Sequence, residues 1–265
     1  SAMILNNSGN SNVAIGAKAL YLNTVKSNLV AIGDSALYKN GQGATSEQAI
    51  FNTAIGSKVL SANTIGLANT GLGFLALTAN ISGNLNTGLG AGVLSENTTG
   101  SFNCAFGTSS LQSNISGSSN VGIGIYALQE LIDGDNNVAI GQRAGNNLAS
   151  GSGNVFLGYE AGYNETASNR LYISNSNADG SSALVYGEFD NQVFRINGNV
   201  GIGESPGSYK LSVLHNSFGL KIQNTNYPTN SWEFFQGPTG NLDLYIQSGS
   251  NIGSFDYVSG VYTAI

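Results

Sequence analysis

Few residues of this chain have the types and the spacing that chemistry requires. A glycan-cleaving site needs two carboxylates about 5 to 9 Å apart, but the seven acidic residues among the first 160 never recur at the regular spacing that orders this part of the chain. The single histidine, His215, lies between Leu214 and Asn216, which indicate neither a metal pair nor a catalytic triad. The sequence therefore predicts that the protein is not an enzyme, with a polysaccharide-degrading enzyme as the alternative.

Two further patterns match loose ligand-binding motifs. Residues 133–137 read Asp-Gly-Asp-Asn-Asn and offer oxygen ligands for Ca²⁺, but the remaining ligands of an EF-hand loop are missing. Residues 71–76 and 122–127 fit a G-x-G-x-x-A dinucleotide pattern, but both are copies of a repeated phrase after which no helix can follow. We therefore expect no cofactor and no metal.

Aromatic residues gather toward the C-terminus and are candidates for stacking against a sugar. Core packing is the favoured interpretation, because nothing in the sequence places them on one face. The candidate receptor contacts are Tyr227, Trp232, Phe234, Phe235 and Tyr245.

A five-residue phrase, such as Asn-Val-Ala-Ile-Gly at 137–141, orders the chain up to about residue 160. Its closing glycines stand at every seventeenth position and form the Gly column: Gly56, Gly73, Gly90, Gly107, Gly124, Gly141 and Gly158. Its opening residues form the Asn column: Asn52, Asn69, Asn86, Asn103, Asn120, Asn137 and Asn154. Such a fixed period indicates a repeat protein, in which each unit buries its apolar surface against the next.

Each repeat carries further columns. Four residues after the first five glycines of the Gly column come Leu60, Leu77, Leu94, Leu111 and Leu128. A second set of asparagines, Asn63, Asn80, Asn97 and Asn114, precedes a second set of glycines, Gly66, Gly83, Gly100 and Gly117.

These columns predict an all-β fold, a β-solenoid in which a new coil begins at every seventeenth position. The phrase alternates with a period of two, as a short strand does, and two glycines in each repeat leave no room for a helix. Parallel stacking in register would let each Asn amide donate to the next. A glycine in every coil indicates a positive φ or a close approach of another chain segment.

The two faces of the phrase strand differ in residue size. We expect the larger apolar residues to face the core, including Ile55, Leu72, Leu89, Phe106 and Ile123, with Cys104 as a small core residue. The opposite face carries only Ala or Gly from residue 14 to residue 139, which predicts that another copy of the chain covers it closely. The sequence thus predicts a parallel assembly of identical chains, and the resemblance described below implies that it is a homotrimer.

The composition argues against two classes of partner, nucleic acids and membranes. The net charge of −6 and the nine scattered Lys and Arg residues argue against nucleic acid as a partner. No stretch approaches about 18 apolar residues, so we expect no membrane insertion.

The sequence divides into four expected segments. Residues 1–11 are expected to be a tag remnant and an N-terminal edge, 12–168 the solenoid, 169–203 a neck or shaft, and 204–265 a β-rich C-terminal section. Extra residues near 40–48, beyond the regular repeat, predict a surface loop.

The phrase Asn-x-Ala-Ile-Gly-x-x-Ala-Leu resembles the head repeats of trimeric autotransporter adhesins of the YadA type, which form a parallel β-roll in a trimer. The segment 169–203, with Asn-Arg-Leu-Tyr-Ile and Ile-Asn-Gly-Asn-Val-Gly-Ile-Gly, is similar to the shaft of tail fibres from phages and injection particles. In such fibres a strand-rich section ending like Gly-Val-Tyr-Thr at 260–263 is followed by a self-cleaving intramolecular chaperone of the endosialidase type.

The resemblance implies a structural and adhesive fibre segment, located extracellularly on a virion, an injection particle or a cell surface. Its expected partners are two further copies of the chain, a glycan or protein receptor on a cell surface, and a downstream chaperone domain. A third function, ice binding, is considered because Thr53, Thr70 and Thr87 form a partial Thr ladder, although Cys104 and Val121 end it.

Overall fold

A computed structural model describes residues 1–202 and, in the remainder, the backbone of six strands within 211–263. The first unit of the chain, Ser1–Asn197, contains the strands β1 (Val13–Ile15), β2 (Val30–Ile32), β3 (Thr53–Ile55), β4 (Thr70–Leu72), β5 (Thr87–Leu89), β6 (Cys104–Phe106), β7 (Val121–Ile123), β8 (Val138–Ile140), β9 (Val155–Leu157), β10 (Arg170–Ile173), β11 (Val185–Glu188) and β12 (Val193–Ile196). The second unit, Gly198–Ile265, contains β13 (Val200–Ile202), β14 (Leu211–Val213), β15 (Leu220–Gln223), β16 (Asn230–Gln236), β17 (Leu242–Ser248), β18 (Ser254–Asp256) and β19 (Val261–Thr263).

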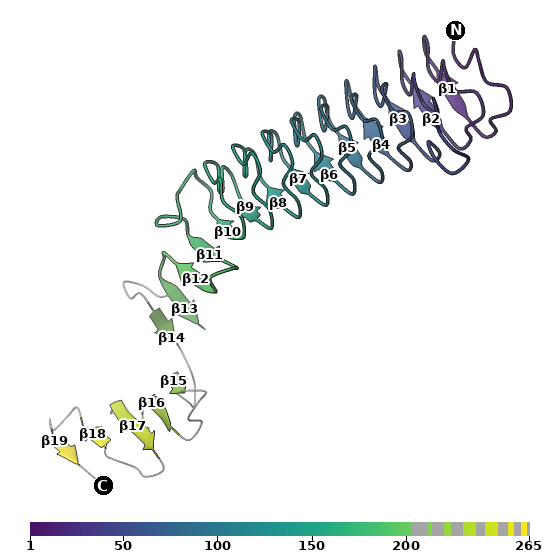
Figure 1. The fold of residues 1–265 in the computed structure, drawn as a ribbon. Helices are drawn as coiled ribbons and strands as arrows, with labels where there is room; N and C mark the ends of the chain where they lie inside the picture. The colour runs from purple at the N-terminus through teal and green to yellow at the C-terminus, as the bar shows by residue number, and fades with distance from the viewer. Residues whose placement is uncertain are drawn as a thin grey trace. The chain divides into compact units, whose positions relative to one another are not determined.

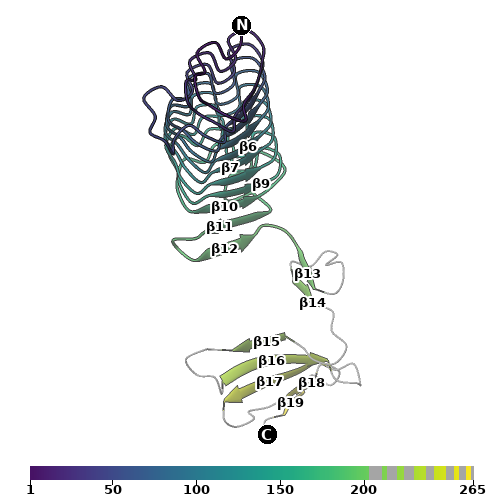
Figure 2. The same cartoon turned by 90° about the vertical axis from the view of Figure 1, so that its right-hand side faces the viewer.

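The first unit is a β-solenoid in which each coil contributes one short strand. Strands β1 to β10 pair in parallel and in sequence order, so that Thr53, for example, lies beside Thr70 (Figure 1, Figure 2). Outside the strands the coils are also bonded to one another, as where the Leu60 N–H donates to the Ala76 carbonyl at 3.1 Å. The predicted all-β solenoid is confirmed, and the described residues contain no helix.

The Gly column marks the corner at which each coil leaves its strand. Gly56 has a φ of +131°, and a Cβ added to it would lie 2.5 Å from the Gly73 carbonyl oxygen of the next coil. Both reasons expected for a glycine therefore apply, since the backbone is left-handed and the neighbouring coil leaves no room for a side chain.

The core faces the opposite way from the prediction. The small middle residues of the strands, such as Ala54 and Ala105, have no exposed surface, whereas Leu72 is 43% and Phe106 39% exposed. Cys104 is half-buried on the outer side with them, and so is not a core residue. The leucines four residues after the Gly column are fully buried and form the core with Val59 and Val93.

The size of the middle residues follows from this packing. A Cβ added to Gly71 would lie 2.5 Å from Val59 Cγ1 and 3.7 Å from the Ala76 Cβ. The same chain therefore covers the small face, and the inference that another copy covers it was wrong. Core leucines leave space only for Ala or Gly at these positions.

The column of small residues ends at Phe156, which is fully buried. Its ring fits because the coils of β8 and β9 carry Gly145 and Gly162 where earlier coils carry a core leucine, and a Cβ on Gly145 would lie 2.5 Å from the Phe156 ring. Tyr172 packs against Phe156, and Tyr186 packs edge-on against Tyr172 with ring centroids 5.1 Å apart. Strands β10, β11 and β12 then turn antiparallel, and the sheet continues past residue 168.

At the N-terminal end, residues 1–3 contact the first coil, because the Met3 N–H donates to the Ala19 carbonyl at 2.8 Å. The extra residues of the second coil form a loop between Asn40 and Ala49. Asn40 Nδ2 donates to the Ala49 carbonyl at 2.9 Å, which joins the two ends of this loop.

The second unit has three separate sheets among its described strands. Strand β13 pairs in parallel with β14, strands β15, β16 and β17 form an antiparallel sheet, and β18 pairs antiparallel with β19.

Candidate functional site

The Asn column is a buried ladder that ties successive coils together. Asn86 has no exposed surface, and its Nδ2 donates to Asn69 Oδ1 at 3.1 Å and to the Gly100 carbonyl at 2.8 Å. Its Oδ1 accepts from the Asn103 backbone N–H at 3.0 Å. Each side chain thus satisfies polar groups of the coils on both sides, which buried groups require.

The second set of asparagines forms a parallel ladder. Asn97 Nδ2 donates to Asn80 Oδ1 at 2.8 Å and to the Gly100 carbonyl at 3.0 Å. Gly100 therefore accepts one bond from each ladder, and the same arrangement recurs at Gly83 and Gly117. The two ladders and the second set of glycines form one structural network.

The second ladder ends at Asn114, because the next position is occupied by Leu131. The buried Asn114 Oδ1 has no hydrogen-bond partner in the described part of the chain. Leu131 and Leu148, one and two coils further on, are fully buried and extend the apolar core instead.

None of the described residues considered for metal binding is brought into a metal site. The described residues hold no group of three His, Cys, Asp or Glu side chains suited to a metal ion. Asn137 belongs to the buried ladder, and Asp135 Oδ1 accepts from the Ser118 N–H at 2.7 Å, so the 133–137 segment is a bonded turn. His215 lies outside the described residues.

Four of the five candidate receptor aromatics lie on described strands of the second unit. Trp232, Phe234 and Phe235 are positions of β16, and Tyr245 is a position of β17 that pairs with Glu233 of β16. Tyr227 lies outside the described residues.

A large apolar surface on the outer side of the strands is the most distinctive feature of the described solenoid. We call it the strand face and define it as the first and third residues of β1 to β9. Its exposed members include Ile15, Leu72, Phe106, Ile123 and Ile140, which are 39 to 59% exposed. Further exposed apolar side chains flank it at Phe51, Phe74, Leu85, Phe102 and Ile125.

The strand face carries no charged residue over its nine strands. At about 4.8 Å per strand it is roughly 40 Å long, and three residues make it about 10 Å wide, so it covers about 400 Å². That area lies within the roughly 300 to 600 Å² of the largest apolar patch on a typical monomer, which is often functional.

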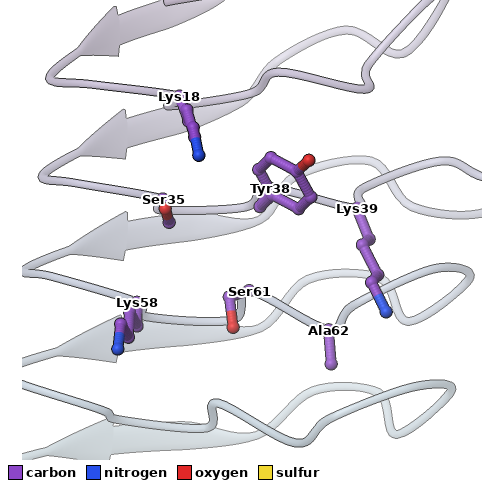
Figure 3. A pocket seen from close by; sticks show the side chains of 7 residues that line it. All are labelled: Lys18, Ser35, Tyr38, Lys39, Lys58, Ser61 and Ala62. Carbon is purple, nitrogen blue, oxygen red and sulfur yellow. The ribbon is translucent and has the colours of Figure 1, made fainter.

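Sequence reasoning also missed a group of lysines. Lys18, Lys39 and Lys58 line one cavity of about 250 Å³ on the coils of β1 to β3, together with Ser35, Tyr38, Ser61 and Ala62 (Figure 3). The residue numbers do not show that these lysines lie close together, because the insertion near Asn40 makes the step from Gly33 to Gly56 longer than the step from Gly16 to Gly33. Lys18 and Lys58 therefore occupy the same column two coils apart.

Comparisons with known protein families, curated proteins and solved structures found no match. The described part of the chain also contains no helix with the length and apolar character needed to cross a membrane.

Proposed function

We propose that the chain is a structural and adhesive segment of an extracellular homotrimeric fibre that binds a receptor on a cell surface. The observation that carries this proposal is the strand face, an uncharged, largely apolar surface of about 400 Å² that the single chain leaves exposed or half-buried. Water contact with such a surface costs free energy in proportion to its area. A partner that covers it is therefore favoured.

A second copy of this chain is the partner that fits the strand face best. The face repeats the same two positions in every coil, so a matching surface must present its own rows at the same strand spacing of about 4.8 Å. Another copy of this solenoid does so when it lies parallel and in register. The number of copies, three, follows the resemblance of the repeats to trimeric adhesin heads.

Light scattering on the purified protein tests the assembly directly. We expect a mass three times the 27.2 kDa of one chain. The variant Ile123→Glu places a charge within the strand face, on β7, and should convert the trimer to folded monomers, because buried like charges around one axis repel.

Ile115→Glu is the matched control. Ile115 is 43% exposed and Ile123 39% exposed, but Ile115 lies outside the strand face. It should leave the mass unchanged, and circular dichroism should show that both variants keep their β structure. A monomeric unmodified protein, or equal behaviour of the two variants, would refute the proposed assembly.

The downstream chaperone is a further part of the proposal and rests on the resemblance of the C-terminal residues. If it is right, expression of the full-length gene product gives two fragments separated near Ile265. An uncut product with an intact chaperone-like segment would contradict it.

Ice binding is the second candidate, and one observation favours it more than the sequence did. The Thr ladder of Thr53, Thr70 and Thr87 lies on the outer side of a parallel sheet in register, not in the core. A regular array of hydroxyl and methyl groups is what an ice-binding surface presents. Measurement of thermal hysteresis tests this, and freezing without hysteresis would eliminate the candidate.

A further inference from the structure

Charge is distributed unevenly along the solenoid. Residues 12–66 carry four lysines and two carboxylates, whereas residues 67–166 carry one arginine and six carboxylates. The N-terminal coils are therefore positive within a protein whose net charge is −6. Such a local field concentrates anions at one end of the molecule.

The lysines of the cavity are available to a ligand. Lys18, Lys39 and Lys58 are exposed, and none forms an ion pair with the described residues. The carboxylates of the same coils, Asp34 and Glu47, do not line the cavity. Three lysines thus line the cavity, and no carboxylate is among its lining residues.

A short column of stacked tyrosines ends next to the cavity. Tyr21 and Tyr38 stack with ring centroids 5.6 Å apart and an angle of 10° between their planes. The next coil carries the small residue Ser61 at this position, with Ala62 after it. Figure 3 shows the ring of Tyr38 above Ser61, with Lys58 on one side and Lys39 on the other. A flat ring placed over Ser61 would continue the stack.

We propose that this cavity binds an acidic sugar residue, a pyranose that bears a carboxylate or a sulfate. The apolar face of the sugar ring would pack on Tyr38, and the acidic group would pair with the lysines by charge-assisted hydrogen bonds. The cavity of about 250 Å³ is slightly smaller than the roughly 300 to 1,000 Å³ of a drug-sized ligand site, which suits one residue of a longer glycan. The proposal names the receptor class of the adhesive function and rests on that function.

The cavity is separate from the strand face. None of its lining residues belongs to β1, β2 or β3 or to the apolar flanks. Self-association through the strand face therefore leaves these side chains accessible, so failure of the glycan site can be distinguished from failure of the assembly.

Calorimetric titration of the whole protein tests the site with polygalacturonate as the carboxylate probe, heparin as the sulfate probe and dextran as the neutral control. We expect binding of at least one acidic glycan and none of dextran. Replacing all three lysines by Gln should weaken binding by at least about tenfold, as the loss of even one charge-assisted bond does. Binding of neither acidic glycan, or equal binding of dextran, would overturn the proposal.

Two further variants separate the site from general charge. Ser61→Tyr keeps every lysine but fills the cavity, so it should abolish binding, whereas Arg195→Gln removes one positive charge elsewhere and should not change it. If oligo-dT binds as tightly as the glycans and is lost in the same lysine variant, the site recognises charge alone and the proposal is wrong. Light scattering on each variant shows whether the trimer persists, so a loss of binding is assigned to the cavity only where the assembly is intact. Absence of glycan binding by an unmodified trimer refutes only the glycan site.

Discussion

Two glycines of one coil provide a sharp test of how the coils are held at their corners. Gly90 has a φ of +140°, and a Cβ added there would lie 2.7 Å from the Gly107 carbonyl oxygen of the next coil. Gly92 also has a positive φ, of +65°, but its added Cβ would meet only Ser109 Oγ, at 3.5 Å. The variants Gly90→Ala and Gly92→Ala make the same chemical change at positions that differ in backbone conformation and in the space around the added Cβ.

The expected costs differ several-fold. At Gly90 an alanine must adopt a backbone conformation that costs about 1 to 3 kcal/mol. Its overlap with a backbone that neighbouring coils hold in place adds about 1 to 3 kcal/mol, so the total is about 2 to 6 kcal/mol. The column of Gly92 already carries Leu75 and Ser109 with φ of 60° and 54°. There the strain of about 1 kcal/mol is partly offset by the lower entropy of the unfolded alanine chain.

Thermal and urea unfolding, followed by circular dichroism, measure both variants against the unmodified protein. We expect a large loss of stability for Gly90→Ala and a change within about 1 kcal/mol for Gly92→Ala. Equal destabilisation would show that positive φ alone is responsible, and would refute the role assigned to the neighbouring carbonyl.

The remaining predictions concern the core, the ladder and pH. Leu94→Ala should lower the free energy of unfolding by roughly 2 to 5 kcal/mol because Leu94 is fully buried, whereas Leu89→Ala should chiefly weaken self-association in light scattering; the reverse result would restore the predicted core face. Asn86→Asp turns a carboxyl oxygen toward two acceptors in a buried site, which raises the pKa of the new carboxyl. The variant should therefore be most stable below the ordinary Asp pKa, and its free energy of unfolding should fall as pH rises in a series of denaturation experiments. A free energy of unfolding that does not depend on pH would contradict this. The pKa of Glu188 is lowered chiefly because Asn191 donates to it, with Tyr186 as a second donor. The stability that these hydrogen bonds give the folded state is present above the ordinary Glu pKa and is lost as pH falls through the lowered pKa. Glu188→Gln should therefore make hydrogen exchange in β11 and β12 less sensitive to acid. An unchanged pH profile of exchange would count against this prediction.

The repeat predicted the solenoid because its period is visible in single columns. A glycine at every seventeenth position indicates a backbone conformation or close approach that recurs in each coil. An asparagine at the same interval indicates a side-chain hydrogen bond that recurs in each coil. The left-handed backbone at Gly56 and the bond from Asn86 to Asn69 both follow from that argument. Neither required knowledge of the coil's cross-section.

The repeat did not reveal which face of the strands is buried in the core. Alternation along the phrase separates Ala54 from Ile55, but it does not say which of the two meets the rest of the coil. That depends on Val59 and Leu60, which follow the corner and turn back over the small residue. The pairing of a small strand position with an unvarying leucine after the corner was the available signal.

The replacement of the core leucines by Gly145 and Gly162 around Phe156 makes the coils unequal as building blocks. Coils between β3 and β7 share the Gly column, the Asn column and the core leucine, so one whole repeat can be removed or duplicated there with these three columns kept in register. The coils around Phe156 do not have this freedom, since its ring occupies space left by Gly145 of the preceding coil and Gly162 of its own. The length of the solenoid can therefore vary in whole coils, shifting the cavity of the N-terminal coils by about 4.8 Å each time, while the aromatic end stays unchanged.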